Sequence, residues 1–467
     1  MKNGFGFLCR LFRVSFAAAA ALILMQSGWA AAGITALLAW HILRKPLPYF
    51  TALLFAFGLL LRLCIILILH PPVISDFELL LQSARSFLAG DYWYLDTEYF
   101  GLWGYQSGFL AWDVFWLWLW DNPFSLKLAN AVFGAAAACL LYRLNREWVD
   151  ERSAQLAAIL LVASPFCSTL TTLLSNQIPS AFFLALGVWI FFSRDCGRLG
   201  FWRFPAAGFA LQLGNILRTE GIILLAAVFA WAVFRCVQER RQMKRLVAGL
   251  AVMLSVYGGI HAAADALVRV SGLHPYGLQN GDPMWKVLTG LNFDSRGGYS
   301  SEDWNALIAQ LDEKNQMCEK SYALQNRLIR ERLSAGPGKL ALHLRNKIKM
   351  QWVEDGLHWM FEHLQEFRPG LVAFVKKYDR GIFFLTFGLA GYGLFGDRKR
   401  WQGRPVSAYF PYFVFIAAFC AFLIVESQPR YVYLPQMYLS LCASMGIERL
   451  ERRLSLLPQE ELRTEGM

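Results

Sequence analysis

Residues 47–70, LPYFTALLFAFGLLLRLCIILILH, run directly into residues 71–90, PPVISDFELLLQSARSFLAG. The first stretch is long and apolar enough to cross a bilayer as a helix, for which about 20 such residues suffice. The second has apolar residues at helical spacing after Ser75 and ends at Gly90, which predicts an amphipathic helix lying flat at the membrane surface. We therefore expect Asp76 where a membrane-spanning helix meets that surface.

The composition of the whole chain supports a membrane protein. Of its 467 residues, 56% are hydrophobic and only 17% are charged, whereas soluble globular chains carry about 25% charged residues. This excludes a disordered chain, a coiled coil and an ordinary cytosolic enzyme. Aromatic residues reach 15%, which is typical of long membrane–water interfaces. The nine cysteines include no CxxC pair, so we expect neither a metal site nor a disulfide framework.

The apolar runs predict an all-α, polytopic membrane protein with about 12 spans. We place the spans near 14–25, 28–43, 47–70, 125–143, 154–173, 177–192, 204–217, 221–235, 246–265, 382–396, 406–425 and 431–447. They divide the chain into an N-terminal transmembrane module (1–265) that includes an outer loop (71–124), an extracytoplasmic loop domain (266–381), C-terminal transmembrane helices (382–447) and a cytoplasmic tail (448–467). The outer loop is expected to carry interfacial helices.

Lysine and arginine predict the orientation, because they are enriched in cytoplasmic loops. The strongest basic cluster is 235–245, and 71–124 contains a single basic residue, Arg85. We therefore expect 71–124 outside a bacterial plasma membrane, with the net charge of +11 reflecting inner loops and not nucleic-acid binding. The N-terminus also resembles a signal peptide, with a small-residue cleavage site in the stretch Gly28-Trp29-Ala30-Ala31-Ala32. Both interpretations leave Asp76 outside.

The chemistry of Asp76 is open from spacing alone. Ser75 and Glu78 fit a capping box, and an acidic residue at a helix N-terminus is favourable by the helix dipole alone. The alternative is a carboxylate that serves a reaction at the membrane surface.

The order of elements in this loop resembles a known superfamily. Ser75-Asp76-Phe77 and the amphipathic helix are followed by Gly-Asp-Tyr (90–92), by Tyr105-Gln106-Ser-Gly and by a tryptophan-rich run to residue 120. The chain resembles GT-C membrane glycosyltransferases, such as protein O-mannosyltransferases and aminoarabinose transferases. It resembles most the bacterial glycosyltransferases of the dolichyl-phosphate-mannose-protein mannosyltransferase type.

The resemblance implies a role for Asp76. In that superfamily an acidic residue of the first outer loop is the catalytic base, and Asp76 matches it. Many members have two adjacent acidic residues, whereas Phe77 separates Asp76 from Glu78 here. The pattern therefore does not indicate a divalent metal, and we expect no cofactor. Glu78 is expected to assist or to bind the acceptor, with Tyr105 and Gln106 lining the cavity.

Two later places carry charge at the ends of apolar runs. Arg218 and Glu220 separate two such runs, and charge at membrane depth marks functional sites by default, although a short outer turn with an ion pair is the alternative. Glu426 precedes Arg430-Tyr431, which resembles an Arg-Tyr-x-x-x-Pro pattern of these transferases. The resemblance implies that Arg430 holds the lipid phosphate, and the alternative is an arginine that snorkels to the interface.

The resemblance implies an inverting glycosyltransferase that uses a polyprenyl-phosphate sugar donor on the outer membrane face. The acceptor would be an envelope glycan, lipid or protein. A carboxylate can take the proton of an acceptor hydroxyl, and arginine can grip the phosphate. A non-catalytic transporter or flippase of a lipid-linked glycan is the alternative, and it would need polar residues near the middle of the bilayer. The charged candidates lie at span ends, which favours the enzyme.

Overall fold

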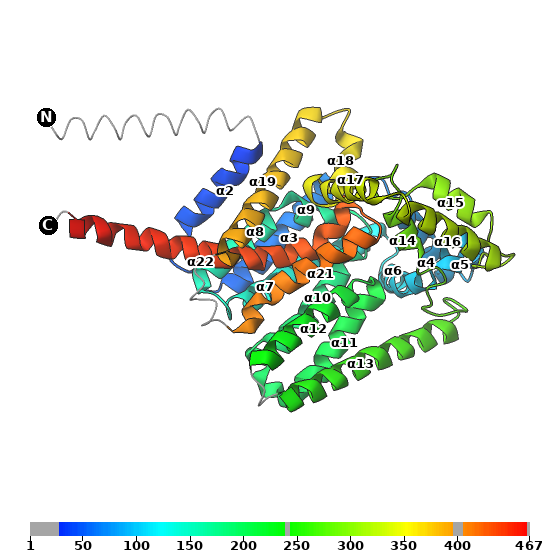
Figure 1. The fold of residues 1–467 in the computed structure, drawn as a ribbon, viewed down its shortest axis with the longest axis horizontal. Helices are drawn as coiled ribbons and strands as arrows, with labels where there is room; N and C mark the ends of the chain where they lie inside the picture. Colours follow the sequence, from blue (N-terminus) through cyan, green and yellow to red (C-terminus); the bar gives the residue numbers. More distant parts are fainter. Residues whose placement is uncertain (1–27, 239–242, 396–404, 465–467) are drawn as a thin grey trace.

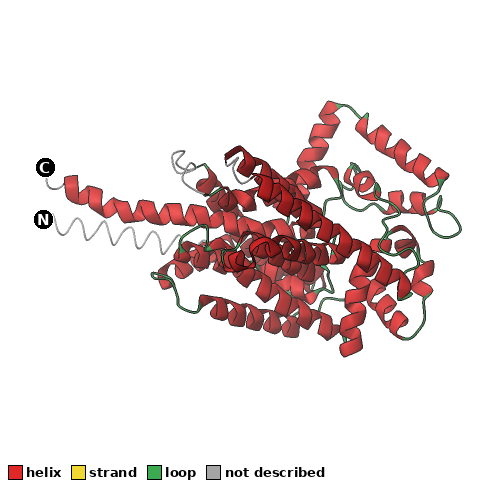
Figure 2. Ribbon diagram, turned by 90° about the horizontal axis from the view of Figure 1, so that it is seen from below, coloured by secondary structure: helices red, strands yellow, loops and turns green. Residues whose placement is uncertain are grey.

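The computed structural model describes residues 28–238, 243–395 and 405–464. Over these ranges the chain consists of helices and loops without strands (Figure 2), which confirms the predicted all-α polytopic class. The predicted span at 14–25 lies outside the described residues.

The membrane region is built from apolar helices and from the short helical segments that connect or interrupt them. These are α2 (Gly28–Ile42), α3 (Phe50–Ile68), α7 (Pro123–Asn145), α8 (Glu151–Ala163), α9 (Pro165–Thr169), η3 (Leu170–Thr172), α10 (Gln177–Phe192), η4 (Asp195–Trp202), α11 (Arg203–Leu217), α12 (Gly221–Gln238), α13 (Met243–Val270), α19 (Pro369–Leu394), η8 (Val406–Tyr409), α21 (Phe410–Ile424), η9 (Pro429–Val432) and α22 (Tyr433–Thr464).

Shorter helices form two connecting regions. The first follows α3 and contains α4 (Asp76–Leu88), η1 (Trp93–Asp96), α5 (Glu98–Leu102), η2 (Gly104–Gln106) and α6 (Ser107–Leu119). The second follows α13 and contains α14 (Trp285–Gly290), α15 (Ser301–Ile308), α16 (Glu319–Leu333), α17 (Pro337–Ile348), η6 (Lys349–Val353), α18 (His358–Phe361) and η7 (Glu362–Leu364).

The structure does not confirm about 12 spans. In the described ranges, 4 helices are long and apolar enough to cross a membrane, or up to 6 if each of two bent pairs is one span. One pair bends by 65° between α8 and α9, where Pro165 begins a new helix and has no N–H to continue the old one. The other bends by 86° in the connection from α10 to α11. Two further apolar helices, 30–42 and 221–236, are shorter.

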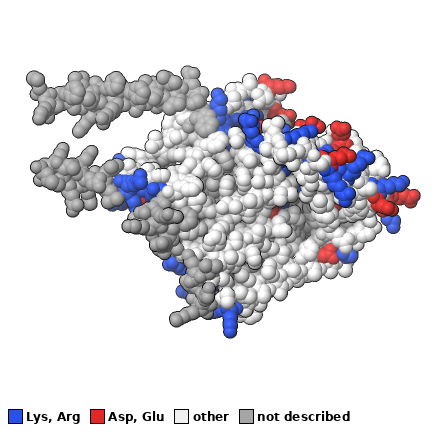
Figure 3. Space-filling model, viewed as in Figure 1, with Lys and Arg blue, Asp and Glu red and all other residues white. Residues whose placement is uncertain are grey.

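The two connecting regions gather at one end of the molecule. Figure 1 places α4–α6 beside α14–α16 there, and the Tyr105 N–H donates to the Gln279 carbonyl oxygen at 2.9 Å between the two regions, while the C-terminal part of α22 extends from the opposite end. On the face in Figure 3, charged side chains crowd toward the α15–α16 end, and the middle is almost uncharged. An uncharged belt between charged ends is what a bilayer requires, because charge is costly in hydrocarbon.

Close helix packing depends on glycine at one contact in particular. A Cβ added at Gly446 of α22 would lie 1.9 Å from the carbonyl oxygen of Leu389 on α19. A Cβ at Gly391, also on α19, would meet nothing within 4 Å. The α19–α22 contact therefore tolerates a side chain at one glycine and not at the other.

We predict that Gly446→Val lowers the free energy of unfolding by about 1–3 kcal/mol, the usual cost of overpacking. Gly391→Val is the matched control and should be neutral or slightly stabilising, because valine favours helix more than glycine does. Thermal unfolding in detergent measures both variants. Equal unfolding temperatures would contradict the close α19–α22 approach.

Candidate functional site

A cavity of about 270 Å³ lies where the two connecting regions meet the ends of the membrane helices. Its walls come from segments far apart in the sequence: the start of α4, η2, the residues before α10, the α11–α12 connection, Lys286, the end of α21 and η9. The structure thus gathers, at one end of the bundle, groups that the sequence presents separately.

Every predicted site residue except Glu78 lines this cavity. The lining includes Asp76, Tyr105, Gln106, Arg218, Glu220, Glu426, Arg430 and Tyr431. The sequence therefore identified side chains that meet in space, and their individual chemical roles remain predictions.

Asp76 and Glu78 occupy different surroundings. Both residues are exposed, but Asp76, the first residue of α4, lines the cavity, whereas Glu78 does not. Two positions along a helix differ by about 200° around its axis, so the two carboxylates do not face the same side. The Ser75 side chain makes no capping hydrogen bond to α4 and instead donates to Asp76 Oδ1 at 3.5 Å. The capping-box interpretation is therefore wrong.

The backbone at Ser75 is unusual. Its φ of 58° lies in the left-handed region, which a non-glycine residue enters at a cost of about 1–3 kcal/mol. This residue turns the chain sharply into α4 and sets Asp76 at the cavity wall. Such strain is often found where a side chain is held for function.

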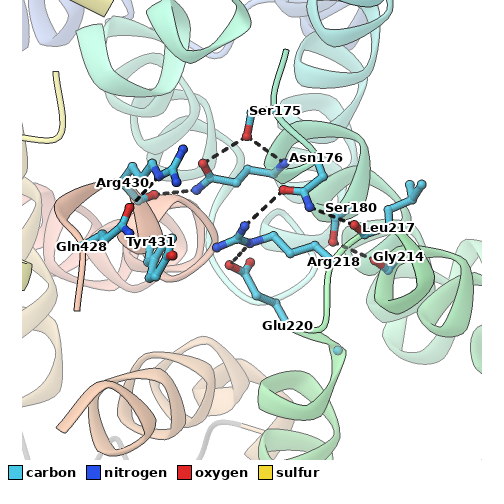
Figure 4. Close-up of polar contacts among 12 residues, drawn as sticks. Ser175, Asn176, Ser180, Gly214, Leu217, Arg218, Glu220, Gln428, Arg430 and Tyr431 are labelled. Atoms are coloured by element: carbon cyan, nitrogen blue, oxygen red, sulfur yellow. Dashed lines mark hydrogen bonds and ion pairs between the residues drawn. The ribbon is translucent and has the colours of Figure 1, made fainter. Parts of the chain in front are cut away.

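Arg218 is fixed by partners on three sides (Figure 4). Its guanidinium donates to Glu220 and to Asn176 Oδ1, the latter at 3.1 Å, and it lies 4.8 Å from the centre of the Tyr431 ring. Burial alone would lower the pKa of Arg218, but Glu220 and Tyr431 outweigh it and raise the pKa above its usual value. Arg218 is thus a permanent cation in the cavity wall.

An ion pair between a half-exposed lysine and a buried carboxylate forms a second wall. The Lys286 ammonium donates to the Glu426 carboxylate, which is 2% exposed and also accepts from Gln428 Nε2 at 2.7 Å and from the Tyr431 hydroxyl at 3.3 Å. Burial raises the pKa of Glu426, but Lys286 and the hydrogen bonds more than offset it and hold that pKa below its usual value. Desolvation likewise lowers the pKa of Lys286, and Glu426 raises it above its usual range.

Arg430 differs from these two cations. Its Nε donates to Gln428 Oε1 at 2.8 Å, and its guanidinium lies 5.1 Å from the Phe77 ring centre and 5.3 Å from that of Trp359. Within the described residues no carboxylate forms an ion pair with Arg430, whereas Arg218 and Lys286 are both paired. Since Phe77 directly follows Asp76, Arg430 lies next to the helix start that presents this carboxylate.

Sequence reasoning missed several groups that build the site. Lys286 is one of several lysines in a long mixed-polar segment, and nothing in the sequence marks it as a partner of Glu426. Asn176 and Gln177 hold Arg218 and the Arg430 carbonyl oxygen, the latter at 2.5 Å, yet they stand between apolar runs without a motif. A polar pair at such a break could have been noted as a helix-end signal.

The carboxylates of the cavity do not form a metal-binding cluster. Across the described residues, no group of three or more His, Cys, Asp or Glu could hold a metal ion. Glu220 and Glu426 are engaged with Arg218 and Lys286. Asp76 forms no ion pair in the described structure, so its carboxylate is the one that can meet an acceptor.

Part of the sequence is similar to a known protein family. Residues 109–258 match a family model described as dolichyl-phosphate-mannose-protein mannosyltransferase. This match covers Asn176, Arg218 and Glu220 but not Asp76 or Arg430. No curated protein sequence matches the chain.

Three solved structures are similar to the fold. The oligosaccharyltransferase of Archaeoglobus fulgidus in its apo form is 14% identical and has a TM-score of 0.50, over 89% of this chain and 52% of that one. AglB from the same organism, in complex with an inhibitory peptide and a dolichol-phosphate, is 14% identical and has a TM-score of 0.48, over 89% of this chain and 52% of that one. ArnT from Cupriavidus metallidurans in the apo state is 17% identical and has a TM-score of 0.37, over 87% of this chain and 78% of that one.

These similarities concern the fold alone, because the identities are low. The chain also spans about half the length of the archaeal enzymes.

We predict that Lys286→Met lowers the free energy of unfolding by about 3–5 kcal/mol, because it leaves the buried Glu426 carboxylate without its counter-ion. Removing both charges, in Lys286→Met with Glu426→Gln, should recover most of this loss. Unfolding of the single and double variants in detergent measures the effect. Additive losses in the double variant would show that the two side chains do not depend on each other.

The lowered pKa of Glu426 predicts a dependence of stability on pH. Its stabilising contribution is fully present above the ordinary value of 4.5 and is lost as the pH falls through the lower value of the folded state. The native protein should therefore lose stability below about pH 4.5 more steeply than Glu426→Gln. Unfolding temperatures from pH 7 to pH 3 test this, and parallel curves would contradict it.

Proposed function

We propose that the chain is a membrane glycosyltransferase of the GT-C superfamily, and that it transfers a sugar from a polyprenyl-phosphate-linked donor to a hydroxyl acceptor. The observation that carries the proposal is a single cavity in which the Asp76 carboxylate and the Arg430 guanidinium share a wall, and neither group forms an ion pair with a described residue. One group is suited to the acceptor and the other to the donor phosphate.

The donor side of the proposal rests on the cations. Arg430, Arg218 and Lys286 line the cavity together, and the phosphate that leaves with negative charge requires oriented positive groups. Arginine binds phosphate with two parallel hydrogen bonds and stays charged. Arg430 is the best suited of the three because, unlike Arg218 and Lys286, it forms no ion pair with a carboxylate of the described residues. The name of the matched family, which contains dolichyl-phosphate mannose, supports a donor whose phosphate is attached to a polyprenyl lipid.

The acceptor side rests on Asp76. Its carboxylate takes the proton of an acceptor hydroxyl while the hydroxyl oxygen bonds to the anomeric carbon of the sugar. The bond from that carbon to the phosphate oxygen breaks, and its electron pair leaves with the phosphate. The other two carboxylates of the cavity, Glu220 and Glu426, are paired with Arg218 and Lys286, so neither is available as a second, covalent nucleophile. This supports a single displacement with inversion at the anomeric carbon.

The position of the cavity supports an enzyme of the outer face of a bacterial plasma membrane. It lies at the end of the bundle that carries 71–124, the segment with almost no basic residues. We propose an envelope glycan, lipid or protein as acceptor. A flippase would need its polar groups near the middle of the bilayer, whereas these groups lie at helix ends.

We predict that Asp76→Asn lowers the transfer rate by about 10²–10⁴-fold, the usual contribution of a general base. Glu78→Gln is the matched control, because it removes the same charge from the same helix turn but outside the cavity, and it should retain the native rate. The assay uses purified protein in proteoliposomes, a labelled polyprenyl-phosphate hexose and a membrane extract as acceptor.

The variants also separate the alternatives. An active Asp76→Asn protein would rule out the base assignment while leaving the transferase in place. Loss of activity in Glu78→Gln alone would move the base to Glu78. Absence of transfer by the native protein, together with movement of labelled lipid between leaflets, would favour the flippase.

A further inference from the structure

A second cavity, of about 410 Å³, lies at the other ends of the helices that carry Arg218 and Glu220. Arg203 begins α11 and Leu217 ends it, and the helix has 15 residues, which corresponds to about 22 Å. Arg235 likewise lies near the end of α12 remote from Glu220. The second cavity is therefore separated from the first by nearly the full length of these helices.

The wall of this second cavity carries positive charge without negative charge. Arg203, Arg235 and Arg245 all line it, and its described lining contains no aspartate or glutamate. Arg203 and Arg245 are close enough for their charges to repel each other. Two guanidinium groups, those of Arg203 and Arg245, face one space and form no ion pair with a described residue, and such an arrangement attracts an anion.

Two acidic side chains near η4 are already engaged. Asp195 pairs with Arg143 at 2.6 Å, and Glu147 accepts from Ser193 Oγ at 2.6 Å and from the backbone N–H of Arg194 at 2.9 Å. Neither carboxylate lines the cavity. In the described structure, Arg203 and Arg245 form no ion pair.

Buried donors point to a missing acceptor at the same place. Arg203 Nε and Trp231 Nε1 are buried and have no hydrogen-bond partner among the described residues, and both side chains line the cavity. A buried donor without a partner costs free energy that a bound acceptor would recover. The wall also includes Phe204 and backbone at Gly200, where a Cβ would meet no atom within 4 Å.

We propose that this second cavity binds a phosphate-bearing anion, at the membrane face opposite the glycosyl-transfer cavity. Arginine groups grip phosphate oxygens through paired hydrogen bonds, and basic pockets between membrane helices at the inner face bind acidic lipid headgroups. The phosphate belongs either to an anionic phospholipid or to a soluble molecule. The inference does not depend on the proposed transfer reaction.

The test measures binding to the full-length protein in detergent by the rise in unfolding temperature with added ligand. The ligands are short-chain phosphatidylglycerol, short-chain phosphatidylcholine and inorganic phosphate. Arg245→Gln is the main variant because Arg245 is exposed at the first turn of α13, where the change should leave folding intact. Arg198→Gln is the matched control, since Arg198 is an exposed arginine of η4 outside the cavity.

We expect phosphatidylglycerol to bind the native protein and Arg198→Gln alike, and Arg245→Gln to weaken its apparent affinity roughly tenfold, in line with a lost charged hydrogen bond. Binding of phosphatidylglycerol without inorganic phosphate assigns the site to a lipid headgroup. Equal, Arg245-dependent binding of both assigns it to soluble phosphate. The proposal is overturned if Arg245→Gln and the native protein bind the ligands equally. It is also overturned if inorganic phosphate does not bind and phosphatidylglycerol binds no better than phosphatidylcholine.

Discussion

The ion pair between Lys286 and Glu426 joins the second connecting region to the end of α21. Beside it, the Glu426 N–H donates to the Lys286 carbonyl oxygen at 2.7 Å, and the Ser427 N–H donates to the Gly297 carbonyl oxygen at 2.8 Å. Lys347 donates to the carbonyl oxygens of Leu423 and Val425 at 3.1 and 2.9 Å. Carbonyl oxygens at the C-terminal end of a helix have no partner within the helix, and Lys347 supplies one for these two. The docked segment in turn leads directly to Arg430 and Tyr431.

This docking determines the distribution of charge in the first cavity. Three cations meet three carboxylates there, and two pairs neutralise each other. Arg430 and Asp76 remain, and the Phe77 ring, on which Arg430 packs, lies one residue after Asp76. If every charged group in the cavity were paired, the charges would stabilise the fold and none would remain to bind a ligand. Arg430 and Asp76 form no ion pair with a described residue, and the proposed reaction uses Arg430 for the anionic leaving group and Asp76 for the proton.

Much of this could be predicted from the sequence. Apolar runs gave the helical membrane class, and charges at the ends of those runs gave most of the cavity wall, because charge beside hydrocarbon needs a reason to persist. Lys286 could not be found in this way, since it lies in a polar segment where a lysine is unremarkable and only tertiary contact gives it a partner. Glu78 was included because it is near Asp76 in sequence, although helix geometry points it elsewhere. The expectation of about 12 spans overlooked that short helices and bends at residues such as Pro165 interrupt the apolar runs.

A structure of the protein bound to its donor tests the central claim most directly. Cryo-electron microscopy of the Asp76→Asn protein in a lipid nanodisc, with a polyprenyl-phosphate hexose, would locate the phosphate and the sugar. The account predicts the phosphate against the Arg430 guanidinium, with the sugar between it and residue 76. A phosphate that contacts neither Arg430, Arg218 nor Lys286 would contradict it.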